Sequence, residues 1–169
     1  MHRHHTQHRK IAIRATALTV VLGVIAFSTG RLIWPPADAM GPSAALLPWF
    51  IILGALESLL FGLGVSFLAF GWHFWKSLPL GKVLKVKSFI AVAWTLVSWW
   101  PHDNLHMHIG MDYGKLLAVE YGFHFTLMLS AVVILAAFMA IGCRDEKAVH
   151  LGYETARNTE EARRWRQEL

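Results

Sequence analysis

Cysteine is nearly absent from this sequence, because Cys143 is the only one in 169 residues. A single thiol cannot form an intrachain disulfide, and a metal site made of several thiolates is excluded. Charged residues are also scarce: they make up 16% of the chain, against about 25% in typical soluble domains. Any metal site must therefore use nitrogen and oxygen ligands, and the composition is not that of a soluble domain.

Apolar residues are correspondingly abundant: 55% of the chain is hydrophobic, and the mean hydropathy is +0.42. A helix needs about 20 mostly apolar residues to cross a bilayer. Four stretches can supply them: residues 11–33, 45–75, 83–104 and 116–141. The third is the least apolar, and it crosses only if Lys85 and Lys87 extend toward the headgroups. The sequence therefore predicts an all-α integral membrane protein, a four-helix bundle within residues 11–142.

The basic residues predict the orientation of these spans, since cytoplasmic segments are enriched in lysine and arginine. The N-terminal segment holds four of them, the loop between the second and third spans holds four, and the C-terminal tail holds six. Only Arg31 and Lys115 remain for the opposite side. Both termini are predicted to be cytoplasmic, in the plasma membrane, and the net charge of +5 needs no nucleic-acid partner to explain it.

Two flanking tails complete the predicted organisation. Residues 1–10 form a basic, histidine-rich cytoplasmic tail whose His2, His4, His5 and His8 could hold a metal only weakly, because nothing fixes their geometry. Residues 143–169 alternate acids and bases, as in a solvated or membrane-skimming helix. Neither tail is assigned any chemistry.

The stretch SWWPHDNLHMHIGMD, residues 98–112, is unusual because it gathers imidazoles and carboxylates directly behind an apolar run. Its tryptophans mark a membrane interface, so the polar residues that follow are predicted at the outer membrane surface. If a helical turn restarts after Pro101, His102 and His106 share one face, whereas Asp103 and His108 lie off it.

Residues of two other spans are predicted at the same depth. Glu120 and His124 are four residues apart at the outer end of the last span, and hence on one helical face. Glu57 lies about four residues below the outer end of the second span, or about 6 Å at 1.5 Å per residue. A carboxylate at that depth is costly unless it faces the protein interior and finds a partner.

Metal coordination suits such a group. Imidazole binds copper, zinc and iron, and carboxylates extend the ligand set toward iron. The predicted ligands of a transition metal ion are His102, His106, His108, Glu120, His124, Glu57 and Asp103, with Asp112 close by. Two other interpretations stay open, namely a metal-free polar or proton-handling cluster and an ordinary membrane interface.

Two functions of different classes follow. The first is an outward-facing enzyme that uses the metal on a lipophilic substrate. The second is a non-catalytic accessory subunit that packs on a larger membrane complex. A stripe of small residues in the second span favours close helix packing, against this chain, a partner protein or a second copy, and it comprises Gly54, Ser58, Gly62 and Ser66.

Overall fold

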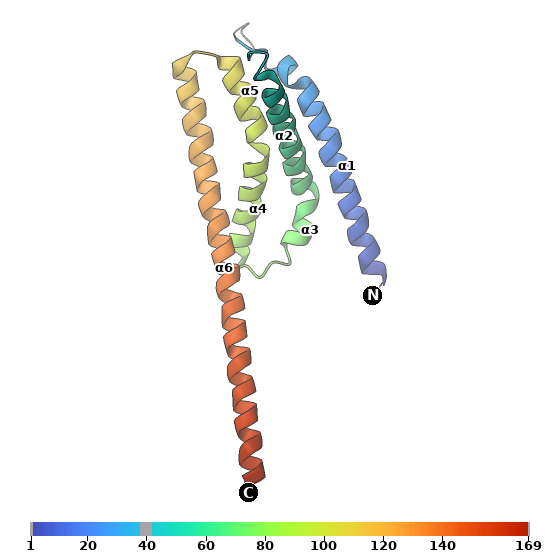
Figure 1. Ribbon diagram of the computed structural model, residues 1–169, viewed down its shortest axis with the longest axis vertical. Helices are drawn as coiled ribbons and strands as arrows, with labels where there is room; N and C mark the ends of the chain where they lie inside the picture. The colour runs from blue at the N-terminus through green and yellow to red at the C-terminus, as the bar shows by residue number, and fades with distance from the viewer. Residues whose placement is uncertain (1, 38–41, 169) are drawn as a thin grey trace.

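The chain folds into helices joined by short loops (Figure 1). The computed structural model describes residues 2–37 and 42–168, without the side chains of residues 2–8 and of many residues beyond Arg144. The elements are α1 (His2–Ile33), α2 (Leu47–Ser66), a π-helical turn η1 (Phe67–Gly71), α3 (Trp72–Trp75), α4 (Lys82–Val97), α5 (Trp99–Ile109) and α6 (Tyr113–Glu168). The predicted all-α class is confirmed for the described residues.

Three helical segments are long and apolar enough to cross a membrane, and they are Arg9–Ile33, Leu47–Trp75 and Tyr113–Arg144. The second of them combines α2, η1 and α3. A fourth candidate consists of α4 and α5, which are bent by 42° relative to each other. The fold therefore has three candidate spans, or four if the bent pair crosses as one.

Pro101 accounts for the bend between α4 and α5. A proline ring clashes with the carbonyl group four residues earlier and donates no hydrogen bond, and that carbonyl belongs to Val97, the last residue of α4. Within α5, Pro101 lies in the first turn, where backbone N–H groups have no helical partner in any case. The sequence suggests a helical turn restarting after Pro101; a helix does restart here, but α5 begins two residues earlier, at Trp99.

The small-residue stripe of α2 packs against α1 of the same chain. A β-carbon at Gly62 would lie 2.3 Å from the backbone oxygen of Thr19, so only glycine allows this approach. The hydroxyl groups of Thr19 and Ser66 are hydrogen-bonded at 3.0 Å. Close packing was the predicted role of the stripe, and the helix that fills it is α1.

Large apolar side chains point outward instead of inward. The buried hydrophobic residues are mostly alanines, whereas Leu32 keeps 81% of its surface exposed and Phe138 keeps 69%. In water this arrangement would forfeit most of the hydrophobic stabilisation. It suits a chain whose outer surface faces lipid, where small residues pack between helices.

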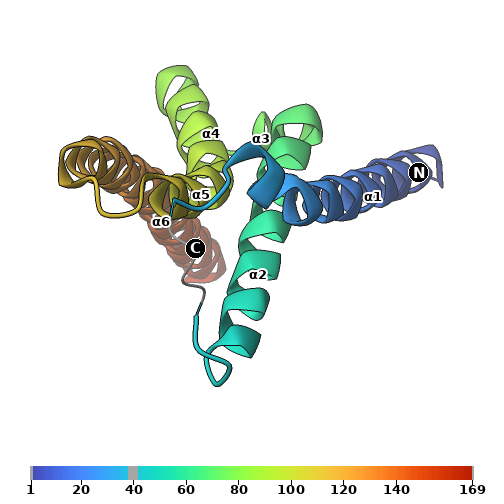
Figure 2. The same cartoon turned by 90° about the horizontal axis from the view of Figure 1, so that it is seen from above.

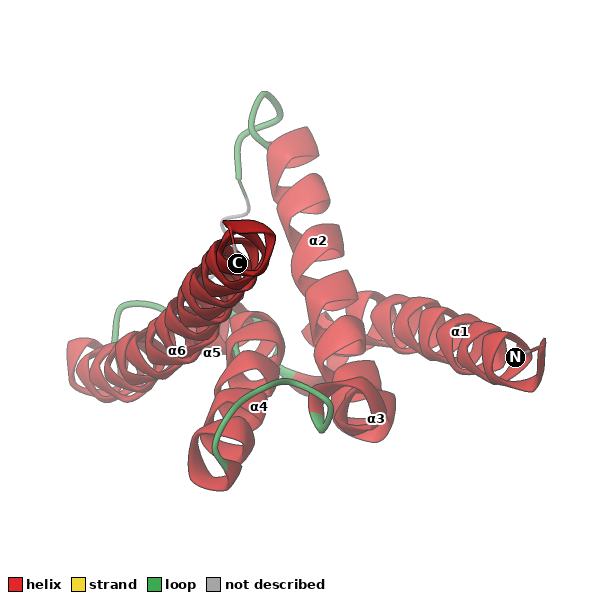
Figure 3. Cartoon of the chain, turned by 90° about the horizontal axis from the view of Figure 1, so that it is seen from below, coloured by secondary structure: helices red, strands yellow, loops and turns green. Residues whose placement is uncertain are grey.

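Helix α6 lies beside α4 and α5, where Nε1 of Trp94 donates to the hydroxyl group of Thr126 at 3.0 Å. Seen from above, α1 and α6 stand on opposite sides of α2, α4 and α5 (Figure 2). Beyond Arg144, α6 continues as one helix to Glu168 (Figure 1), as predicted for the charged tail. The view from below shows the loop that joins α3 to α4 (Figure 3).

Candidate metal centre

His102 and His106 lie on one face of α5, because they are four residues apart in a helix. Their ring centroids are 4.6 Å apart. The His102 ring also lies 5.1 Å from the ring of Phe123 on α6, and only 7% of the surface of His102 is exposed. Packing against α6 thus restricts where this imidazole can point.

Glu120 on α6 lies between two imidazoles. Nδ1 of His124, one turn later on the same helix, is 2.6 Å from Oε2 of Glu120. Nε2 of His106, from α5, contacts Oε1 of the same carboxylate. The predicted shared face of Glu120 and His124 is confirmed, and this carboxylate connects the two helices at the loop end of α6.

His102, Glu120 and His124 form a group that could bind a metal ion. One ligand atom from each of the three residues lies within 4.8 Å of the other two. Metal bonds to histidine nitrogen or carboxylate oxygen are about 2.0–2.2 Å long, so ligand atoms on one ion lie about 3–4 Å apart. The three atoms are thus somewhat farther apart than ligands of one ion, and side-chain rotation would have to close the difference.

The two ring nitrogens of His102 have different surroundings. Nδ1 lies 3.0 Å from Oδ1 of Asp103, whereas Nε2 is buried and has no hydrogen-bond partner in the described part of the chain. A carboxylate beside Nδ1 holds the proton on that nitrogen and leaves a lone pair on Nε2. A buried nitrogen without a partner is costly, and a metal ion would satisfy it.

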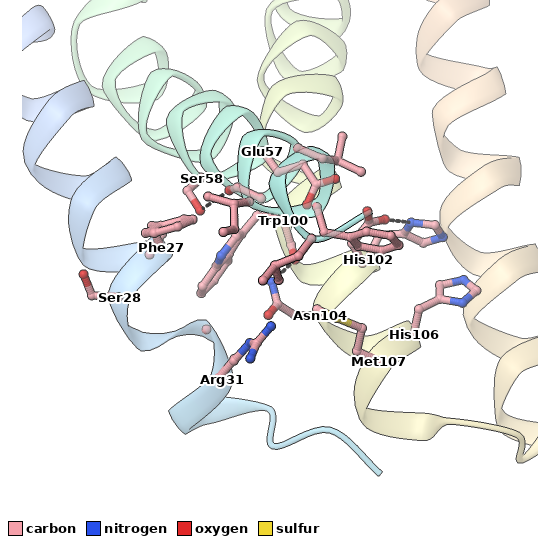
Figure 4. Close-up of a pocket in the computed structure, with 18 of the residues that line it drawn as sticks. Phe27, Ser28, Arg31, Glu57, Ser58, Trp100, His102, Asn104, His106 and Met107 are labelled. Carbon is pink, nitrogen blue, oxygen red and sulfur yellow. Dashed lines mark hydrogen bonds and ion pairs between the residues drawn. The ribbon is translucent and has the colours of Figure 1, made fainter. Parts of the chain in front are cut away.

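Glu57 extends this arrangement from α2. It is buried, with 8% of its surface exposed, and its carboxyl group is within hydrogen-bonding reach of Asp103. Three side chains from two helices therefore lie in sequence, with Glu57 near Asp103 and Asp103 against His102; Figure 4 shows Glu57 and His102 on the same side of the cleft. Asp103 is thus the polar group that comes nearest to the partner predicted for Glu57 from the sequence.

A cleft of about 790 Å³ adjoins the group. It lies among α1, α2, α5 and α6, and His102, Glu120 and His124 all line it. Its remaining wall is partly apolar, with Phe27 from α1 and Phe50 from α2. The volume is within the range of about 300–1,000 Å³ typical of ligand pockets.

Other predicted ligands lie elsewhere. Nδ1 of His108 lies 2.8 Å from the carbonyl oxygen of Pro35, 73 residues away along the chain. This contact attaches the loop after α1 to the end of α5. The N-terminal histidines 2, 4, 5 and 8 lie outside the residues whose side chains are described.

Asp112 occupies the turn before α6 and is bound to Lys115. Nζ of Lys115 lies 2.8 Å from Oδ2 of Asp112, and the backbone N–H of Lys115 donates to Oδ1 at 3.3 Å. The side-chain hydrogen bond from Lys115 is the main cause that lowers the pKa of Asp112 below its ordinary value of 3.8. This carboxylate caps α6 and stands apart from the His102, Glu120 and His124 group.

Two residues of the cleft, Arg31 and Asn104, were not predicted as part of a site from the sequence. Asn104 is buried, and its amide nitrogen donates to the carbonyl oxygen of Trp100 at 2.7 Å. A β-carbon at Gly30 would lie 2.8 Å from Oδ1 of Asn104, so α1 and α5 meet closely here. The only signal for Arg31 in the sequence was that it is one of two basic residues on the side predicted to be outside.

No known relative accounts for this arrangement, since no family model, no curated protein and no solved structure matches the chain.

Proposed function

We propose that this chain is a polytopic membrane protein that binds one transition metal ion through His102, Glu120 and His124. The observation that carries the proposal is the convergence of three ligand atoms from α5 and α6 within 4.8 Å. The unpartnered Nε2 of buried His102 supports it. In the metal-bound state, Glu120 and His124 turn from each other to the ion.

The ligand set favours zinc or iron among the metals that imidazole binds, with copper as the third candidate. Two histidines and one glutamate form the catalytic ligand set of some zinc hydrolases, and two histidines with a carboxylate also hold iron(II). Such sites keep at least one coordination position for water or substrate. His106 lies beside Glu120 and supplies either a fourth ligand or a base at that position.

We infer an enzymatic role from the cleft that the metal group lines. A metal ion with an open position polarises a bound oxygen or lowers the pKa of a bound water. Because the cleft wall is partly apolar and the chain has lipid-facing helices, the substrate class that fits is lipophilic. A protein partner that bound the small-residue stripe would have to displace α1. We therefore propose no protein partner at this stripe.

The orientation in this proposal follows the basic residues, which put the termini in the cytoplasm. The even number of crossings, if α4 and α5 cross as one span, keeps both ends of the chain on one side. The metal group lies at the opposite end, where α5 and α6 meet (Figure 1). It therefore faces the outside of the cell.

The test is a metal titration of purified, untagged, metal-stripped protein with zinc and with cobalt(II). Wild type is expected to bind one ion, and His124→Ala is expected to weaken binding by more than the about 10–100-fold typical of residues that only support a ligand. His108→Ala is the matched control, because His108 bonds to Pro35 at the same end of α5. Equal affinities for wild type and His124→Ala would overturn the proposal.

A further inference from the structure

Arg31 is the one lysine or arginine among the described residues that line the cleft. Two of the three carboxyl groups that line the cleft contact imidazoles instead, Asp103 that of His102 and Glu120 those of two histidines. Arg31 has no hydrogen bond or ion pair among the described residues. The guanidinium group of Arg31, which is exposed, is therefore a positive charge at the cleft wall with no carboxylate beside it in the described part of the chain.

The position of Arg31 directs this charge into the cleft. It lies in the last turn of α1, and Figure 4 shows its side chain reaching toward Asn104 on α5. Asn104 cannot neutralise a guanidinium group, and its amide nitrogen is already bound to Trp100. A guanidinium group binds carboxylate and phosphate oxygens through parallel hydrogen bonds, so the ligand that fits is an anion.

The remaining wall of the cleft is partly apolar, and its apolar part is exposed. Phe27, Phe50 and Ile51 line it, and each keeps about half of its surface exposed, at 49%, 51% and 50% respectively. These side chains belong to α1 and α2, which are both candidate membrane spans. An apolar chain could therefore enter from the lipid while its polar end remains at Arg31.

We propose that this cleft binds a single-chain anionic amphiphile, with its phosphate or carboxylate head at Arg31 and its chain along Phe27 and Phe50. A cleft of about 790 Å³ suits one chain better than a two-chain phospholipid, since drug-sized ligands fill pockets of about 300–1,000 Å³. The inference names the substrate class for the proposed metal site, and it rests on that proposal only for the chemistry performed at the metal end.

The test measures binding of radiolabelled lysophosphatidate to the full chain in nanodiscs. Wild type is expected to bind saturably, and Arg31→Gln is expected to bind about tenfold more weakly or worse, as when a hydrogen bond to a charged group is removed. Lys115→Gln is the matched control, because Lys115 is the other basic residue predicted outside and pairs with Asp112. Equal affinity of Arg31→Gln and wild type would overturn the proposal.

Two competitors identify which part of the ligand is recognised. Lysophosphatidylcholine with the same chain is expected to compete poorly, because its choline cation opposes Arg31. Glycerol 3-phosphate, the head without the chain, is also expected to compete poorly. Equal competition by the choline lipid would overturn the anionic head, and equal competition by glycerol 3-phosphate would overturn the apolar chain.

A second variant tests the path of the chain. Gly54 lines the cleft, and a β-carbon there would meet only Phe27, at 3.8 Å. Gly54→Leu is expected to fill part of the cleft and lower lysophosphatidate affinity, and Gly54→Ala, whose β-carbon makes only an ordinary contact with Phe27, is the control for its effect on helix packing. Unchanged affinity would contradict the proposed path.

Metal content is measured on the same samples to separate the two proposals. Arg31-dependent binding by protein that holds no metal would support the amphiphile site and overturn the metal site. Stoichiometric metal together with lysophosphatidate binding that does not depend on Arg31 would support the metal site and overturn the amphiphile site.

Discussion

Oδ1 of Asp103 lies 3.0 Å from Nδ1 of the neighbouring His102, and the opposite ring nitrogen of His102 has no hydrogen-bond partner in the described residues. This relationship makes Asp103 a positioning residue, because it fixes which nitrogen of His102 carries a lone pair. Glu57 on α2 lies near the Asp103 carboxyl group. These three side chains connect the second span to the candidate metal ligands.

Asp103→Asn tests this role. An asparagine amide can donate to Nδ1 and so favours the proton on Nε2, which removes the lone pair. We expect zinc affinity to fall by about 10–100-fold, as for other residues that support a metal ligand, with little change in Tm. Asp112→Asn is the control, because the Asp112 carboxylate is bound to Lys115. This variant should keep the wild-type zinc affinity. An unchanged affinity in Asp103→Asn would contradict the role.

Gly62 and Gly54 belong to the same stripe but are expected to respond differently to alanine. At Gly62 the new methyl group meets backbone atoms of Thr19 and Gly23 at 2.3 and 2.9 Å, which cannot rotate away. We expect Gly62→Ala to lower the free energy of unfolding by about 1–3 kcal/mol, the usual cost of overpacking.

At Gly54 the methyl group makes only an ordinary contact with Phe27. Gly54→Ala should be neutral, or more stable by about 0.5–1 kcal/mol because alanine favours helix. Unfolding of both variants in mixed micelles measures the difference. Equal stability of the two would show that α1 does not pack on the stripe as described.

The single cysteine allows a direct test of orientation. Cys143 is exposed near the end of the last candidate span, on the side predicted to be cytoplasmic. In intact cells a membrane-impermeant maleimide should leave it unlabelled, and permeabilisation should allow labelling. His108→Cys in a Cys143→Ala background should label without permeabilisation. Labelling in the opposite pattern would reverse the orientation and put the metal group inside.

The turn before α6 should respond to pH through Asp112. Because Lys115 lowers the pKa of Asp112 from 3.8, the ionised cap stabilises the folded turn fully above pH 3.8, and this contribution is lost as pH falls through the lower folded-state pKa. The chemical shift of the Lys115 amide nitrogen should report that transition by NMR, with a midpoint below pH 3.8.

Lys115→Met removes the main cause of the shift. The midpoint of the Asp112 transition should then move to higher pH, toward the ordinary aspartate pKa of 3.8. A transition that stays in place would show that Lys115 does not lower this pKa.

Local helical geometry was predictable from the sequence. The pairing of Glu120 with His124 follows from a separation of four residues in a helix, and the shared face of His102 and His106 follows likewise. The need of Glu57 for a partner follows from its depth in an apolar span. Each of these inferences uses only the position of a residue along one helix.

Contacts between helices were not predictable in this way. The contact of His106 with Glu120 depends on how α5 bends away from α4, and the contact of His108 with Pro35 depends on where the loop after α1 crosses α5. Arg31 enters the cleft because α1 packs on the small-residue stripe, and a stripe alone does not identify the helix that fills it.

The most direct test of the metal site is elemental analysis of the untagged protein purified from its membrane without added metal. The account predicts about one transition metal ion per chain in wild type, lost in a His102→Ala and His124→Ala double variant that still inserts and keeps its Tm. No metal in wild type, or the same metal content in the double variant, would contradict it.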